Sequence, residues 1–93
     1  MKTIMIADDD SAILALLSYT FESDGFKVSL VKNGLEALDL ASKRDFDVIL
    51  LDMMMPIMSG LETLQKLRAL PNGGSIKIIA LTNMNDPDMV SSI

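Results

Sequence analysis

Acidic or hydroxyl side chains directly follow three apolar runs of the sequence. Asp8, Asp9 and Asp10 come after the run 4–7, Asp52 comes after the run 48–51, and Thr82 comes after the run 76–81. The carboxyl ends of neighbouring parallel strands meet at one edge of a sheet, which is where ligands bind in open α/β folds. If these runs are adjacent parallel strands, several carboxylates and one hydroxyl converge on one crevice.

Clustered carboxylates repel one another, and a hard divalent cation relieves that repulsion. Mg²⁺ prefers oxygen ligands and commonly binds through one or two carboxylates together with a phosphate group. A carboxylate can also act as a nucleophile and form an acyl phosphate. These residues therefore predict a Mg²⁺-dependent site at which an aspartate accepts a phosphoryl group. The structural alternative is that the aspartates only cap helices or end strands in solvent.

Composition excludes several other kinds of chemistry. The sequence has 93 residues, a net charge of −5, no cysteine and no histidine. Disulfides, thiolate metal sites, thiol nucleophiles and Ser-His triads are therefore excluded. The acidic balance argues against binding to nucleic acid or to an anionic membrane. No signal peptide is recognisable and no apolar stretch approaches the roughly 18 residues of a membrane helix, so we expect a cytoplasmic protein.

The hydrophobic pattern alternates between the periods of strands and helices. Apolar runs predict strands at 4–7, 26–31, 48–51 and 76–81. Helical spacing predicts helices that begin after Asp10, Asn33, Ser59 and Asp86. In the first of these helices, the expected buried face consists of Ile13, Leu16, Leu17 and Phe21. Four strand–helix units with short connections predict one α/β domain with a parallel sheet and right-handed crossovers.

The chain resembles the receiver domains of two-component response regulators over its whole length, 1–93. The resemblance rests on the acidic pair within 4–10, on 34–38, on the Asp-x-x-Met-Pro-x-x-x-Gly motif within 47–60, and on the strand at 78–82 that ends in threonine. It implies a flavodoxin-like, CheY-like fold, in which three layers form a doubly wound parallel sheet with β-strand order 2-1-3-4-5. Here that fold would be truncated to about four βα units.

The resemblance also implies a role for each matched residue. Asp52 is expected to be the phosphoacceptor, and Thr82 the hydroxyl that hydrogen-bonds the phosphoryl oxygen. Mg²⁺ is expected to bind Asp9 and Asp52 directly, Asp8 mainly through water, and the backbone carbonyl of Met54. Asp10 has no role in the family site, and we expect it to cap the first helix. The implied partner is a histidine kinase or a phosphotransfer protein.

The sequence departs from the family after Thr82. A receiver domain normally adds a fifth strand that ends in lysine and then a fifth helix. The lysines of this chain all precede Thr82, and none matches the family lysine: Lys2, Lys27, Lys32, Lys43, Lys66 and Lys77. We therefore expect impaired phosphoryl acceptance. The last strand would also be an open edge, which predicts a homodimer formed through the edge 76–82 and the stub 84–93.

Two further functional interpretations remain open. The chain could be a dimerising interaction module, or kinase decoy, in which phosphotransfer is weak or absent. It could also be an engineered fragment of a receiver domain. An enzyme acting on a free substrate is not expected, because carboxylates are the only available general bases and no pocket-forming insertion is visible. Self-catalysed phosphorylation and dephosphorylation would be its most enzymatic activity.

Overall fold

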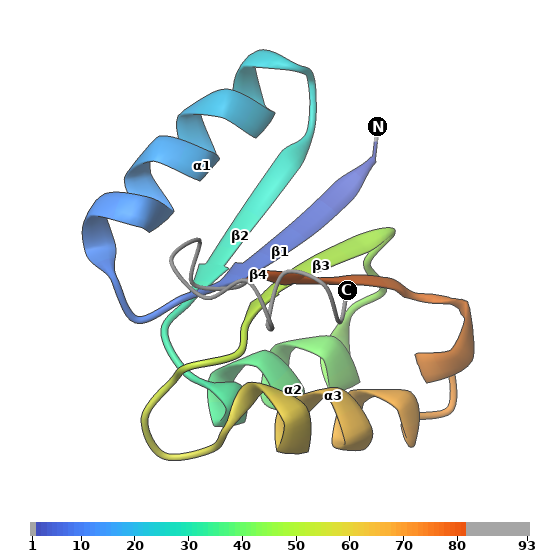
Figure 1. The fold of residues 1–93 in the computed structure, drawn as a ribbon. Helices are drawn as coiled ribbons and strands as arrows, with labels where there is room; N and C mark the ends of the chain where they lie inside the picture. Colours follow the sequence, from blue (N-terminus) through green and yellow to red (C-terminus); the bar gives the residue numbers. More distant parts are fainter. Residues whose placement is uncertain (1, 82–93) are drawn as a thin grey trace.

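The computed structural model describes residues 2–81, which form one four-stranded parallel sheet with three α-helices (Figure 1). The helix expected after Asp86 lies outside the described residues. None of the described helices is long and apolar enough to cross a membrane. The elements in chain order are β1 (Thr3–Ala7), α1 (Ser11–Ser23), β2 (Lys27–Val31), α2 (Gly34–Lys43), β3 (Val48–Asp52), α3 (Gly60–Arg68), the 3₁₀ helix η1 (Gly73–Ser75) and β4 (Lys77–Leu81).

The sheet has the doubly wound topology expected from the sequence. Its strand order is β2-β1-β3-β4 and all three pairings are parallel. Helix α1 covers one face of the sheet, while α2 and α3 cover the other (Figure 1). Strands β1 and β3 are central, so their residues are buried on both faces. This three-layer arrangement confirms the flavodoxin-like, CheY-like fold class.

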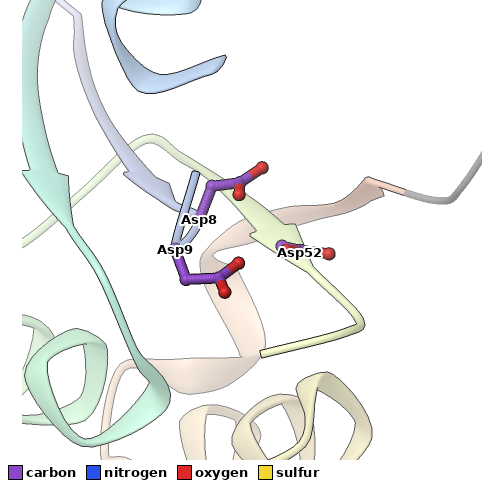
Figure 2. A group of neighbouring side chains, drawn as sticks. All are labelled: Asp8, Asp9 and Asp52. Carbon is purple, nitrogen blue, oxygen red and sulfur yellow. The ribbon is translucent and has the colours of Figure 1, made fainter. Parts of the chain in front are cut away.

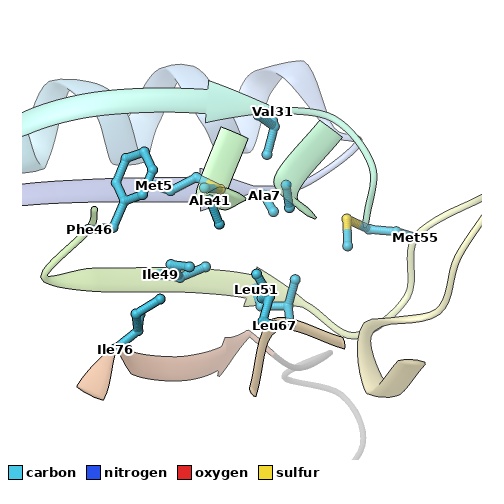
Figure 3. Packing of buried hydrophobic residues seen from close by; sticks show 11 residues of the cluster. Met5, Ala7, Val31, Ala41, Phe46, Ile49, Leu51, Met55, Leu67 and Ile76 are labelled. Carbon is cyan, nitrogen blue, oxygen red and sulfur yellow. The ribbon is translucent and has the colours of Figure 1, made fainter. Parts of the chain in front are cut away.

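Two hydrophobic clusters hold these layers together, one on each face of the sheet. On the face covered by α2 and α3, Ile49 and Leu51 of β3 pack with Ala41 and Leu67 (Figure 3). On the opposite face, Leu50 of β3 belongs to the cluster around α1. Successive residues of a strand point to opposite faces, so one apolar run supplies both clusters. Packing on both faces therefore holds the central strands β1 and β3 in place up to the carboxyl edge of the sheet.

Each described α-helix begins at a polar residue whose side chain accepts backbone N–H groups. The carboxylate of Asp10 accepts from Ala12 and Ile13, as expected for a cap. The side chain of Asn33 caps α2, and that of Ser59 caps α3. Such caps satisfy donors that the helix itself leaves free and typically contribute about 1 kcal/mol each. They also set where each helix leaves the sheet edge that carries the aspartates.

The expected buried face of α1 was partly wrong. Leu14 is buried, and Leu17 and Phe21 pack on the same cluster. In contrast, Leu16 is 66% exposed and Ile13 is 40% exposed. Apolar residues occupy most positions of the first two turns of α1. Two overlapping faces of the helix therefore both show the i, i+3, i+4 spacing of apolar residues that predicts a buried face. The position of the helix on the sheet selects the face that contains Leu14.

Candidate functional site

The candidate site lies where β1 and β3 end side by side. Ala7 of β1 pairs with Leu51 of β3, so Asp8 and Asp52 follow at the same level of the sheet. Figure 2 shows the carboxyl groups of Asp8, Asp9 and Asp52 gathered at this edge. A carboxylate oxygen from each of the three lies within 4.8 Å of one from each of the others. The convergence expected from the strand ends is therefore present for these three residues.

Hydrogen bonds to backbone N–H groups orient two of the three carboxylates. Asp8 is almost fully buried, and one of its oxygens accepts the N–H of Asp10 at 2.9 Å. Asp52 is partly buried and accepts the N–H of Met54 at 3.0 Å. Asp9 is exposed to solvent. The site thus combines two carboxylates fixed by the fold with one that can adjust to a ligand.

The pKa of the Asp52 carboxyl group is raised to about 6, from an ordinary value of 3.8. Removal of the group from water is the main cause, and the negative charges of Asp8 and Asp9 add to it. The N–H of Met54 acts in the opposite direction by stabilising the carboxylate. The ionised form of Asp52 is therefore costly in this position unless a cation balances its charge.

The donor set fits a hard divalent cation such as Mg²⁺. All three side chains offer carboxylate oxygens, which are the ligands that Mg²⁺ prefers. Oxygens bound to one Mg²⁺ at about 2.1 Å can be no more than about 4.2 Å apart. The carboxylate oxygens lie within 4.8 Å of one another, so at most a small closing movement, or a water molecule between the ion and one carboxylate, is needed. Exposed Asp9 is the residue best able to make that movement.

The predictions for the other site residues, Thr82, Met54 and Asp10, differ in how far the structure tests them. Thr82 lies outside the described residues, directly after Leu81, which pairs with Asp52 in the sheet. Met54 lies beside the cluster through its N–H bond to Asp52, and its side chain is 72% exposed. Coordination of a metal by the Met54 carbonyl stays a prediction. Asp10 caps α1 and takes no part in the three-carboxylate cluster.

The loop between Asp52 and α3 contains a strained residue that the sequence did not reveal. Ile57 has φ 73°, and it is the only non-glycine residue with positive φ in the described part of the chain. A β-branched side chain in this region clashes with its own backbone. Its side chain is 72% exposed, so packing inside the domain does not require an isoleucine. The strain is confined to the loop that follows Asp52.

Replacing Ile57 with Asn is expected to stabilise the domain by about 1 kcal/mol. Asn tolerates the left-handed region, so the backbone keeps its conformation without the steric cost. Urea unfolding of the two proteins measures the difference. Leu35→Asn is a matched control, because Leu35 is also exposed but lies in α2 with ordinary helical geometry. Equal or lower stability of Ile57→Asn would show that the loop relieves the strain in another way.

Comparison with known proteins identifies the family of this chain. The family model for the response regulator receiver domain matches residues 4–93. The chain belongs to this family. The resemblance drawn from the sequence motifs is therefore confirmed.

Two curated relatives show how much of the chain this similarity covers. The chain is 36% identical to sporulation initiation phosphotransferase F of Bacillus subtilis over 89 residues, which cover 96% of this chain and 70% of that protein. It is 40% identical to the CpxR homolog of Haemophilus influenzae, a transcriptional regulatory protein, over 77% of this chain. That match covers only 31% of the regulator, so the chain corresponds to about a third of such proteins.

Solved receiver domains have the same fold. Chemotaxis response regulator CheY4 of Vibrio cholerae superposes with a TM-score of 0.90 at 32% identity, covering 98% of this chain and 76% of that one. The receiver domain of sensor histidine kinase PA1611 from Pseudomonas aeruginosa gives a TM-score of 0.88 at 30% identity, covering 96% of this chain and 74% of that one. The latter structure has a magnesium ion coordinated in its active site cleft.

Proposed function

We propose that this receiver domain accepts a phosphoryl group on Asp52, in a Mg²⁺-dependent reaction, from a histidine kinase or a phosphotransfer protein. The observation that carries the proposal is the convergence of three carboxylates within 4.8 Å. Among them, Asp52 has its pKa raised to about 6, so its charge is the one that a ligand would neutralise most favourably. At neutral pH this carboxylate remains mostly ionised and can act as a nucleophile.

The proposed reaction is a single displacement at phosphorus. A carboxylate oxygen of Asp52 attacks the phosphorus atom of a phosphohistidine, and a new O–P bond forms while the N–P bond breaks. The bonding electrons return to the ring nitrogen, and the donor leaves as a neutral imidazole that keeps the proton on its second nitrogen. The product on Asp52 is an acyl phosphate. The N–H of Met54 holds the Asp52 carboxylate in a fixed orientation throughout.

The residues that would hold Mg²⁺ are Asp8, Asp9, Asp52 and the backbone carbonyl of Met54. When bound, the ion supplies positive charge that offsets the charge on the transferred phosphoryl oxygens. Support comes from the oxygen-only donor set and from the related receiver domain that was solved with magnesium in its cleft. In the same proposal, the Thr82 hydroxyl hydrogen-bonds a phosphoryl oxygen. In the same proposal, Asp8 acts mainly through water.

The proposal treats residues 1–93 as one receiver domain that works as a signalling module in the cytoplasm. We do not propose that it is a classical enzyme, which would need a general base and a pocket for a free substrate. The only catalysis proposed is the self-catalysed gain and loss of the phosphoryl group. All lysines of this chain precede Thr82. We therefore propose that the chain is phosphorylated more slowly than a receiver domain that carries the family lysine.

Removal of Mg²⁺ provides the test of this function. Acetyl phosphate is a small phosphodonor that needs no protein partner, and labelling is measured with and without a chelator of divalent cations. We expect labelling in Mg²⁺ and a decrease of at least about tenfold in the chelator, because the carboxylate charge is then uncompensated. Labelling that is absent in both conditions, or equal in both, would contradict the proposal.

A second proposal concerns the exposed edge of the sheet. Within residues 2–81, β4 pairs only with β3, and Ile79 of β4 is 38% exposed. An unpaired strand edge with apolar side chains favours pairing with another chain. We propose that the 93-residue chain forms a twofold homodimer through 76–82 and 84–93, of which 77–81 is the described part. Such a dimer would also serve the alternative function of an interaction module.

The dimer proposal predicts a change of mass in solution. At micromolar concentration, light scattering after size-exclusion chromatography should give the mass of a dimer for the wild-type chain. Ile79→Lys should shift the chain to monomer, because two lysines would face each other near the twofold axis. Tyr19→Lys is the control, since Tyr19 is exposed on α1 away from this edge, and this variant should stay dimeric. A monomeric wild-type chain would refute the dimer.

A further inference from the structure

The positive charges of the domain are unevenly distributed between the two edges of the sheet. All eight lysine and arginine residues lie within the described part of the chain. Seven of them precede or begin a strand, or lie at the end of a helix that returns to the amino edge of the sheet: Lys2, Lys27, Lys43, Arg44, Lys66, Arg68 and Lys77. Lys32 is the eighth, and it lies at the carboxyl edge together with the aspartate cluster.

Lys32 is held at this edge by contacts with three elements. It follows Val31, the last residue of β2, and the carbonyl of Val31 accepts the N–H of Asp8 at 3.1 Å. The backbone N–H of Lys32 donates to a carboxylate oxygen of Glu36 at 2.8 Å. Its ammonium group donates to the hydroxyl of Ser11, the first residue of α1, at 3.2 Å. The side chain therefore reaches from β2 to the end of the loop that carries Asp8 and Asp9.

Lys32 forms no ion pair with another residue of 2–81. The ion pairs found in residues 2–81 are Lys43–Asp39 and Lys66–Glu62, and neither involves Lys32. A phosphodonor is an anion, and the carboxylates of the cluster repel it as it approaches Asp52. A positive charge on the same rim, unpaired within residues 2–81, lowers this repulsion. The effect acts through space, so mobile salt ions screen it.

We propose that Lys32 is a positioning residue that attracts the anionic phosphoryl group of the donor toward Asp52. The proposal rests on the proposed function of Asp52 as phosphoacceptor. Lys32 acts on the approach of the donor and makes no bond to the reacting atoms. Its removal should therefore slow labelling at subsaturating donor without changing which residue is labelled.

The test measures the second-order rate constant of labelling by acetyl phosphate, in saturating Mg²⁺, at low and at high salt. Lys32→Gln should react about two- to fivefold more slowly than wild type at roughly 0.01 M salt, where charges act over about 30 Å. At roughly 0.5 M salt the two rates should converge. Lys32→Arg keeps the charge and should restore the wild-type rate. Urea unfolding of each variant shows whether the fold is unchanged.

Lys27→Gln is the matched control, because Lys27 begins the same strand at the opposite edge of the sheet. It removes the same charge and should leave the rate within about 1.5-fold of wild type. A Lys32→Gln rate equal to wild type at low salt, or reduced by the same factor at every salt concentration, would overturn the proposal. A wild-type chain that takes no label at all would instead refute the function of Asp52 on which it rests.

Discussion

Asp52→Asn is expected to abolish labelling by acetyl phosphate and to stabilise the fold at neutral pH. The amide cannot form an acyl phosphate, so no label should appear. The stability gain follows from the site, where burial and the charges of Asp8 and Asp9 make the ionised carboxylate unfavourable. An amide of nearly the same shape removes that unfavourable charge. It still offers an oxygen to the N–H of Met54.

The pH dependence of this gain has a definite sign. Because burial and its acidic neighbours raise the pKa of Asp52 to about 6, the folded chain holds this proton more tightly than the unfolded chain. The contribution of the proton to stability is complete below the ordinary pKa of 3.8 and is lost as pH rises through about 6. Asp52→Asn should therefore gain little at about pH 4 and most above about pH 7.

Urea unfolding without Mg²⁺, at several pH values, measures this difference. Solvent screens the partly buried group, so we expect a gain of about 1 kcal/mol at neutral pH. Asp39→Asn is the control, because Asp39 is exposed and outside the cluster, and its stability should stay within about 0.5 kcal/mol of wild type. A variant that still takes label, or that is less stable than wild type at neutral pH, would contradict the assignment of Asp52.

Gly60→Ala is expected to destabilise the domain by about 3 kcal/mol and to displace Asp52. A Cβ atom at Gly60 would lie 2.3 Å from the Cα of Met53 and 2.7 Å from the carbonyl oxygen of Asp52. Both are backbone atoms, so the clash can be relieved only by moving backbone, either at the end of β3 or at the start of α3. The N–H of Gly60 also donates to the carbonyl of Met53 at 3.2 Å, and that bond would be lengthened.

Gly74→Ala is the control for this substitution. Nothing lies within 4 Å of a Cβ atom built at Gly74, so its stability should change by less than about 0.5 kcal/mol. Labelling of Gly60→Ala by acetyl phosphate should fall by about tenfold or more, because a small displacement of a nucleophile has a large effect on rate. If Gly60→Ala is as stable and as readily labelled as Gly74→Ala, the close approach of α3 to Asp52 does not restrict residue 60 to glycine.

The sequence predicted the strands and the carboxylate cluster because both depend on local patterns. The run 48–51 is apolar at every position, which is typical of a central parallel strand, and a polar residue that follows such a strand must lie at its carboxyl edge. The pairing of Ala7 with Leu51 then brings Asp8 next to Asp52. No side-chain detail was needed for this part of the site.

Features that depend on three-dimensional context could not be predicted in the same way. In α3, the apolar side chain of Leu61 is 57% exposed, while the polar side chain of Thr63 is fully buried against the N-terminus of α2 near Gly34. The spacing of apolar residues along a helix does not determine the angle at which α2 and α3 pack against each other. The contact of Lys32 with Ser11 likewise depends on β2 lying beside β1 and on the direction of a long side chain.

The most direct measurement of the central claim is the location of the phosphoryl group. The wild-type chain is treated with acetyl phosphate and Mg²⁺ and digested, and the modified residue is assigned by tandem mass spectrometry. We expect one phosphoryl group, attached to Asp52. A phosphoryl group found instead on Asp8 or Asp9, or on a residue outside the cluster, would contradict the account.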